Sequence, residues 1–212
     1  MDDNEHPQEY DADDFGCSIF PSSMESMLPN AKDIYQKLRN GVHITNLGEG
    51  GALLYRELQK REASYQQLFT LLGYELVHDS SGFFYFNNTE ERSAALLSAT
   101  KKAALVIYTL FSYLEDQNID PAYTLREQPI AWASFTSAQT YHQDLYRDAE
   151  IPDASALRKS INWLKDKGFC IEEGDNIRFL SPIERFLRSV ENWSASDEQS
   201  NDSSDTDTEI EG

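Results

Sequence analysis

The sequence predicts a mainly α protein with small β-hairpins, an α+β fold in which two units of one kind follow each other. In each half of the chain, segments with helical spacing of apolar residues precede two short runs of aromatic and β-branched residues. A turn separates the two runs in both halves. The 212 residues suffice for two domains of about 100 residues each.

The net charge of −19 is concentrated at the two ends of the chain. Eight acidic residues and no Lys or Arg lie between Met1 and Ala31, and seven more acids lie beyond Ser194, again without a base. Both ends are also poor in apolar residues, so they cannot bury enough surface to offset the entropy of ordering. We therefore predict a disordered acidic arm over 1–28 and a disordered acidic tail over 194–212, flanking a nearly neutral ordered region.

The first unit is predicted over residues 29–92. A short helix at its start should end before Gly41, and Ala52–Leu72 has the apolar spacing of two further helices. Tyr74–Val77 and Phe83–Phe86 are rich in residues that favour strands, and a polar loop of about five residues separates them. The unit should therefore end in a β-hairpin.

The second unit is predicted over residues 93–193 and begins with Leu96–Leu114, a largely apolar stretch typical of a buried central helix. Thr136-Ser137-Ala138-Gln139 has the spacing of a capping box and predicts the start of a helix that runs to about Arg147. A third helix should open at Pro152-Asp153 and end at Gly168. No element is predicted for the stretch 116–132.

A second hairpin is expected after this helix. Phe169–Glu173 and Ile177–Leu180 are its strands, and Gly174-Asp175-Asn176 is its turn. Pro182 should start a last helix with an apolar stripe. Helices followed by a terminal hairpin outline a winged helix, so we predict two tandem winged-helix domains.

Residues for catalysis or metal binding do not form a known pattern. The four histidines, at positions 6, 43, 78 and 142, lie in different predicted elements without paired metal-ligand spacing. The Gly48–Gly51 loop contains a carboxylate and lacks the lysine of a phosphate-binding loop, and no G-x-S-x-G elbow is present. We therefore expect no catalytic residue, metal site or cofactor, and a protein that is not an enzyme.

The compartment follows from the ends of the chain and its cysteines. Cys17 and Cys170 lie far apart without disulfide-framework spacing, and the N-terminus has acids where a signal peptide needs bases. The most apolar run, Ala103–Leu114, is too short to span a bilayer. We expect a cytoplasmic protein that does not contact the membrane.

One helix face is a candidate for DNA contact. Polar residues recur at helical spacing on the outer side of the third helix of the second unit, where a helix-turn-helix protein enters the major groove. Asp153 and Asp166 dilute its charge, so an ordinary solvated face is the competing interpretation. The candidate DNA-contacting residues are Arg158, Lys159, Asn162, Lys165, Lys167 and, on the wing, Arg178.

Three segments resemble the MukE/MksE family. Leu38–Ile44 contains a G-x-H-I motif formed by Gly41, His43 and Ile44, and Leu157–Leu164 is similar to the family's second recognition helix. The run Gly82, Phe83, Phe84 and Tyr85 resembles the first wing. We expect these motif residues to be structural, with His43 in a helix-end hydrogen bond or in packing rather than in direct partner contact.

The resemblance implies a kleisin-interacting tandem winged-helix subunit, known as a KITE protein, of a MukBEF/MksBEF-like bacterial condensin. Such a subunit is a homodimer that binds a MukF/MksF-like kleisin and, through it, an SMC-like ATPase. It would contact DNA within the complex and associate with the nucleoid. Chromosome organisation, with condensation and segregation, and plasmid defence are both roles of such complexes.

The alternative is a sequence-specific winged-helix transcriptional regulator. In that case Arg158, Asn162 and Lys165 would read bases in the major groove. The nearly neutral charge of the ordered region argues against such a regulator, because one that binds DNA alone should carry a basic stripe.

Overall fold

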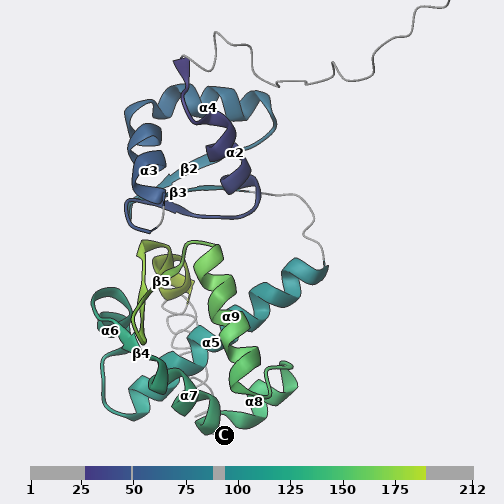
Figure 1. Ribbon diagram of the computed structural model, residues 1–212, viewed down its shortest axis with the longest axis vertical. Helices are drawn as coiled ribbons and strands as arrows, with labels where there is room; N and C mark the ends of the chain where they lie inside the picture. Colours follow the sequence, from purple (N-terminus) through teal and green to yellow (C-terminus); the bar gives the residue numbers. More distant parts are fainter. Residues whose placement is uncertain (1–26, 49, 88–93, 190–212) are drawn as a thin grey trace, which may run out of the picture.

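The computed structural model describes residues 27–48, 50–87 and 94–189 (Figure 1). Almost all of the predicted acidic arm, the whole of the acidic tail and the predicted boundary between the two units at 92/93 lie outside these residues. Within them, helices alternate with two small antiparallel sheets. The predicted mainly helical α+β class is confirmed.

The first unit consists of three helices and one sheet of three strands with the order β1-β3-β2. Its elements are α2 (Ala31–Arg39), β1 (Ile44–Thr45), α3 (Gly51–Lys60), α4 (Glu62–Leu71), β2 (Leu76–Asp79) and β3 (Phe83–Phe86).

The core of the first unit joins one apolar face of each helix to the sheet. Ile34 and Leu38 of α2, Leu58 of α3 and Phe69 of α4 are fully buried with Phe84 of β3. The helical spacing of these residues explains why the three helices were predictable: burial of one stripe per helix is the main stabilising contribution.

The second unit repeats this plan with additional helices, and its sheet has the order β4-β6-β5. Its elements are α5 (Ala94–Asp116), α6 (Pro121–Glu127), β4 (Ile130–Ala131), α7 (Trp132–Tyr141), α8 (Gln143–Asp148), α9 (Ala154–Asp166), β5 (Cys170–Glu173), β6 (Asn176–Phe179), the 3₁₀ helix η1 (Ser181–Ile183) and a final helical segment over 184–189.

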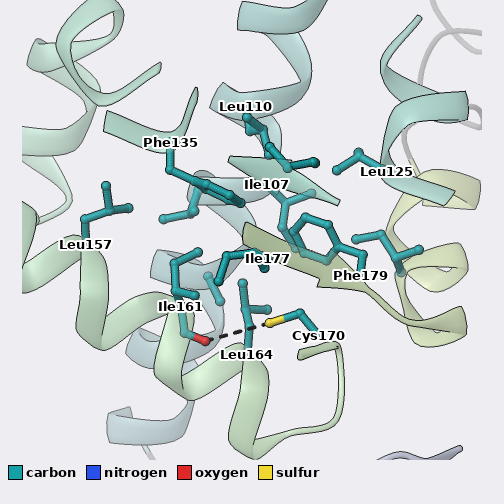
Figure 2. Close-up of a cluster of buried hydrophobic side chains, with 14 of the residues drawn as sticks. Ile107, Leu110, Leu125, Phe135, Leu157, Ile161, Leu164, Cys170, Ile177 and Phe179 are labelled. Carbon is teal, nitrogen blue, oxygen red and sulfur yellow. Dashed lines mark hydrogen bonds between the residues drawn. The ribbon is translucent and has the colours of Figure 1, made fainter. Parts of the chain in front are cut away.

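The second core gathers around α5 (Figure 2). Leu110 of α5, Phe135 of α7, Ile161 of α9 and Phe179 of β6 are at most 3% exposed. Cys170 also lies here, with its Sγ atom 4.0 Å from the carbonyl oxygen of Ile161. Burial raises the pKa of the Cys170 thiol to about 12, so this cysteine behaves as a packed apolar side chain and not as a nucleophile.

The two units share the order helix, strand, helices, hairpin. They also end their last long helix in the same way. Gly73 after α4 and Gly168 after α9 adopt φ of +83° and +78°, and the following residues donate to Phe69 and Leu164 at 2.9 Å in both cases. This repeat supports the winged-helix assignment, which stays a prediction.

Three short elements were not predicted. The strands β1 and β4 have two residues each, too few to show an alternating pattern. The helix α6 fills part of the stretch without a prediction. Its sequence signal was present: Asp120 caps the first turn by accepting from the backbone N–H of Tyr123 at 2.9 Å, and Pro121 occupies the first helical position.

The predicted capping box was wrong. The helix α7 begins at Trp132, whose backbone N–H donates to Asp175 of the β5–β6 turn at 3.0 Å. Thr136 therefore lies inside the helix, and Gln139 donates its side-chain N–H to Ile151. The helix also stops at Tyr141 before α8 begins, so the predicted single helix is two.

Both hairpin loops are shorter than predicted. His78 and Asp79 extend β2 because they pair with Phe84 and Phe83 across the sheet. The second turn has two residues, since Asn176 pairs with Glu173. The last helix begins with η1 around Pro182 and continues to the end of the described residues, so its predicted C-terminal part lies outside them.

The two units meet where α9 ends (Figure 1). The backbone N–H of His43, in the first unit, donates to the carbonyl oxygen of Lys167 at 2.9 Å. Lys167 returns a hydrogen bond from its ammonium group to the carbonyl oxygen of Asn40. A Cβ atom on Gly168 would overlap the carbonyl oxygen of His43, so this approach requires glycine.

Gly73 and Gly168 give a matched test of this contact between the two units. G73A should cost about 1 kcal/mol of unfolding free energy, the strain of left-handed backbone, because nothing lies within 4 Å of the added carbon. G168A should cost about 2–4 kcal/mol because overlap with His43 adds to the same strain. Chemical denaturation measures both losses, and equal losses would show that the two units do not pack tightly at Gly168.

Candidate functional site

The two motifs that carry the family resemblance are adjacent in the structure. Gly41, at φ +74°, ends α2 and turns the chain into His43 and Ile44. Ile44 then pairs with Phe84 in the β1–β3 ladder. The G-x-H-I and G-F-F-Y segments, recognised separately in the sequence, therefore form one surface of the first unit.

His43 connects this surface to the second unit by two side-chain hydrogen bonds. Its Nδ1 atom lies 3.0 Å from the carbonyl oxygen of Lys167, and its Nε2 atom lies 2.8 Å from Nη1 of Arg185. A carbonyl can only accept and a guanidinium can only donate. Both bonds therefore form only with a neutral ring that carries its proton on Nδ1.

Aromatic rings enclose the imidazole on the remaining sides. Ring centroids of Phe83, Tyr85 and Phe169 lie 5.6, 5.8 and 4.6 Å from that of His43. The guanidinium of Arg185 also stacks over Tyr85 at 4.1 Å, a cation–π contact. His43 is thus both hydrogen-bonded and packed, but its acceptor lies 124 residues away and not at its own helix end.

Burial sets the protonation state of this histidine. Removal from water is the largest influence and lowers the pKa of His43 to about 4. The hydrogen bond to the Lys167 carbonyl raises the pKa, whereas the positive charge of Arg185 lowers it. The ring is neutral at physiological pH, as the two hydrogen bonds require.

A second link between the units is an ion pair. Arg188 donates from Nη2 to both carboxylate oxygens of Asp79, at 2.9 and 2.8 Å. Burial raises the pKa of the Asp79 carboxyl group. The backbone N–H of Ser81 and the guanidinium of Arg188 lower the pKa by more, so the net shift is downward. We call His43, Lys167, Arg185, Arg188 and Asp79 the junction.

The candidate DNA face lies at the other side of α9, and acidic residues of strand β5 neutralise much of its charge. Arg158 and Lys165 both donate to Glu172 of β5, at 3.1 and 2.8 Å. Arg178 of β6 donates to Glu173 at 2.7 Å. Three of the six predicted residues, Arg158, Lys165 and Arg178, therefore lie at one place, and each is paired with a glutamate that was not among the predicted site residues.

The other three predicted residues take no part in these three ion pairs. Lys159 and Asn162 are exposed on α9, whereas Lys167 belongs to the junction. Arg158 also stacks on Trp132 at 3.8 Å. The sequence offered a signal for the neutralisation, because Glu172 and Glu173 occupy the strand next to the basic helix.

Neither a metal-ligand cluster nor a candidate membrane span occurs in the described parts of the chain. Within 27–48, 50–87 and 94–189, His, Cys, Asp and Glu nowhere gather in groups of three that could hold a metal ion. Among the helices described there, none combines the length and apolar composition that a membrane crossing requires.

Comparison with known proteins decides the family. The sequence model of the family described as condensin complex protein MksE matches residues 29–191. The chain belongs to the MksE family. The predicted membership is confirmed, and the MksE-family match makes this chain a condensin complex subunit. No curated protein matches the chain.

The match spans both units of this MksE-family chain and every residue of the junction. The two motif segments and the ends of α9 and of the last helix are therefore parts of one family unit. The hydrogen bonds and the ion pair of the junction hold these segments together, although they are distant in sequence.

The pH dependence of stability tests the neutral state of His43. Because the folded pKa of about 4 lies below the ordinary 6.5, its contribution is complete above pH 6.5 and is lost as the pH falls towards 4. Protonation would set the ring against Arg185 and Lys167, with only Asp79 nearby to compensate. We expect a loss of about 3 kcal/mol across this window, measured by urea denaturation at a series of pH values.

The control for this measurement is H43Q. A glutamine can donate one hydrogen bond and accept the other, but it does not titrate. The variant should be less stable than the wild type at pH 7, and the difference between the two should shrink as the pH falls to 4. A constant difference would show that His43 titrates normally.

The wing glutamates give a test of the DNA face. The double variant E172Q/E173Q removes the two carboxylate charges that pair with Arg158, Lys165 and Arg178. Affinity for nonspecific duplex DNA should rise roughly tenfold at low salt, with a salt dependence steeper by about one to two released ions. Fluorescence anisotropy across a salt series measures both quantities.

A matched control is E150Q, which removes an exposed acid paired with Lys102 on a different surface. It should leave DNA affinity unchanged. Equal affinities for the wild type, the control and the double variant would rule out DNA contact by the α9 and wing face.

Proposed function

We propose that this chain is a non-enzymatic accessory subunit of a MukBEF/MksBEF-like condensin, and that it dimerises and binds a kleisin of the MukF/MksF type. Through the kleisin it regulates the SMC-like ATPase. The observation that carries the proposal is the family match over 29–191, which includes both units and the junction.

The pattern of charge pairing supports a protein-binding role for the two tandem winged helices. In the second unit three of the basic side chains that would contact DNA, Arg158, Lys165 and Arg178, are paired with Glu172 and Glu173. A regulator that reads bases needs such side chains free to form bidentate contacts. The pairing therefore favours the condensin subunit over the transcriptional regulator.

DNA contact belongs to the assembled complex in this proposal. Lys159 and Asn162 remain exposed on α9. The face can add a weak electrostatic contribution when partner subunits hold DNA nearby, since effective concentration then replaces intrinsic affinity. The proposed location is accordingly the cytoplasm, at the nucleoid, in a complex that serves chromosome organisation or plasmid defence.

The decisive experiment is a pull-down of the kleisin encoded in the same gene cluster. We expect the purified chain to retain this kleisin at micromolar concentration, and R158A/N162A, which alters only the DNA face, to retain it equally. Loss of binding by wild-type protein would overturn the proposal.

The same purified chain can be used to distinguish the condensin subunit from the transcriptional regulator. Duplex DNA selected from a random pool should show no preferred sequence with the isolated chain. Nanomolar, sequence-selective binding that R158A/N162A abolishes would establish the transcriptional regulator instead.

A further inference from the structure

The central helix α5 has a second apolar stripe on the side that faces away from the core. Leu97 and Tyr108 are 44% and 49% exposed, although Val106 and Leu110 of the same helix are fully buried. Spacings of four and three residues alternate along this side, as in a helix that packs against another helix. We call the six residues the outer stripe: Leu97, Lys101, Ala104, Tyr108, Phe111 and Glu115.

Most contacts of α5 within the chain use other sides of the helix, and Phe111, at the edge of the outer stripe, also packs against the core. Thr109 is hydrogen-bonded to Tyr146 of α8 at 2.7 Å, and Lys102 pairs with Glu150 at 2.9 Å. These positions lie about 100° or more around the helix from Tyr108. Apart from Phe111, the outer stripe is therefore not needed to hold α8 or the core in place.

The two charges of the outer stripe lie at opposite ends of it. Lys101 and Glu115 are separated by about 21 Å along the helix, too far to pair with each other. Neither side chain forms an ion pair within the described parts of the chain. When two such stripes lie antiparallel, the lysine of each copy comes to the same end as the glutamate of the other. The stripe is therefore complementary in charge to a second copy of itself.

We propose that the outer stripe binds the outer stripe of a second copy of this chain, as an antiparallel helix pair about a two-fold axis. The inference rests on the homodimer of the proposed function and names its surface. In a two-fold interface each residue meets a different residue of the other copy, so one base and one acid form two equivalent pairs.

The side-chain sizes fit one register. If the axis passes between positions 104 and 108, Tyr108 of each copy packs on Ala104 of the other, a large residue on a small one. In that register Lys101 is offset from Glu115 of the second copy by four residues, about 6 Å along the helix axis, within reach of two long side chains. The ends of the pair are thus charge-matched and its centre is apolar.

Charge reversal tests this arrangement by sedimentation velocity over a range of chain concentrations. K101E and E115K should each weaken the dimer roughly tenfold or more, because each places like charges together twice. The double variant K101E/E115K restores opposite charges and should regain most of the wild-type affinity. Such a rescue arises only if the two residues meet across the interface, since a misfolded variant would not recover.

K60E is the control, because Lys60 is an exposed lysine of α3 in the first unit. It should dimerise like the wild type. If the wild type is a dimer and the charge variants match it, the outer stripe is not the interface, while the proposed dimer stands. If the wild type is a monomer throughout, both fail, and the kleisin pull-down still tests the remaining proposed function independently.

Discussion

The imidazole of His43 is the contact on which the arrangement of the two units depends. It donates to the Lys167 carbonyl at the end of α9 and accepts from Arg185 in the last helical segment. Because the ring is buried, a rotation of one unit against the other would leave polar atoms without partners, at a cost of about 1–3 kcal/mol for each. The two apolar cores can pack separately, but this ring sets their relation.

The junction also explains the requirement for small and aromatic residues around it. Gly168 allows the backbone of α9 to approach His43, and Phe83, Tyr85 and Phe169 exclude water from the ring. Exclusion of water keeps the histidine neutral, and only the neutral ring makes both hydrogen bonds. Packing and protonation state therefore support each other.

The charged residues of the second unit are used mainly within the chain. Glu172 and Glu173 hold the bases of α9 and β6, and Lys167 contributes to the junction. The basic side chains of α9, the helix predicted to contact DNA, therefore mainly form contacts within the chain. This agrees with the proposed function, in which DNA contact belongs to the assembled complex.

The helices and hairpins with clear local signals, from Asp153 at the start of α9 to the turn at Gly174, were predictable from the sequence. So were the motifs of the family. Such features depend on neighbouring residues alone. The hydrogen bond from His43 to Lys167, the start of α7 at Trp132 and the pairing of Arg158 with Glu172 could not be predicted in this way. The reason is physical: each of these contacts satisfies a donor or a charge with a partner that the fold, and not sequence proximity, brings near.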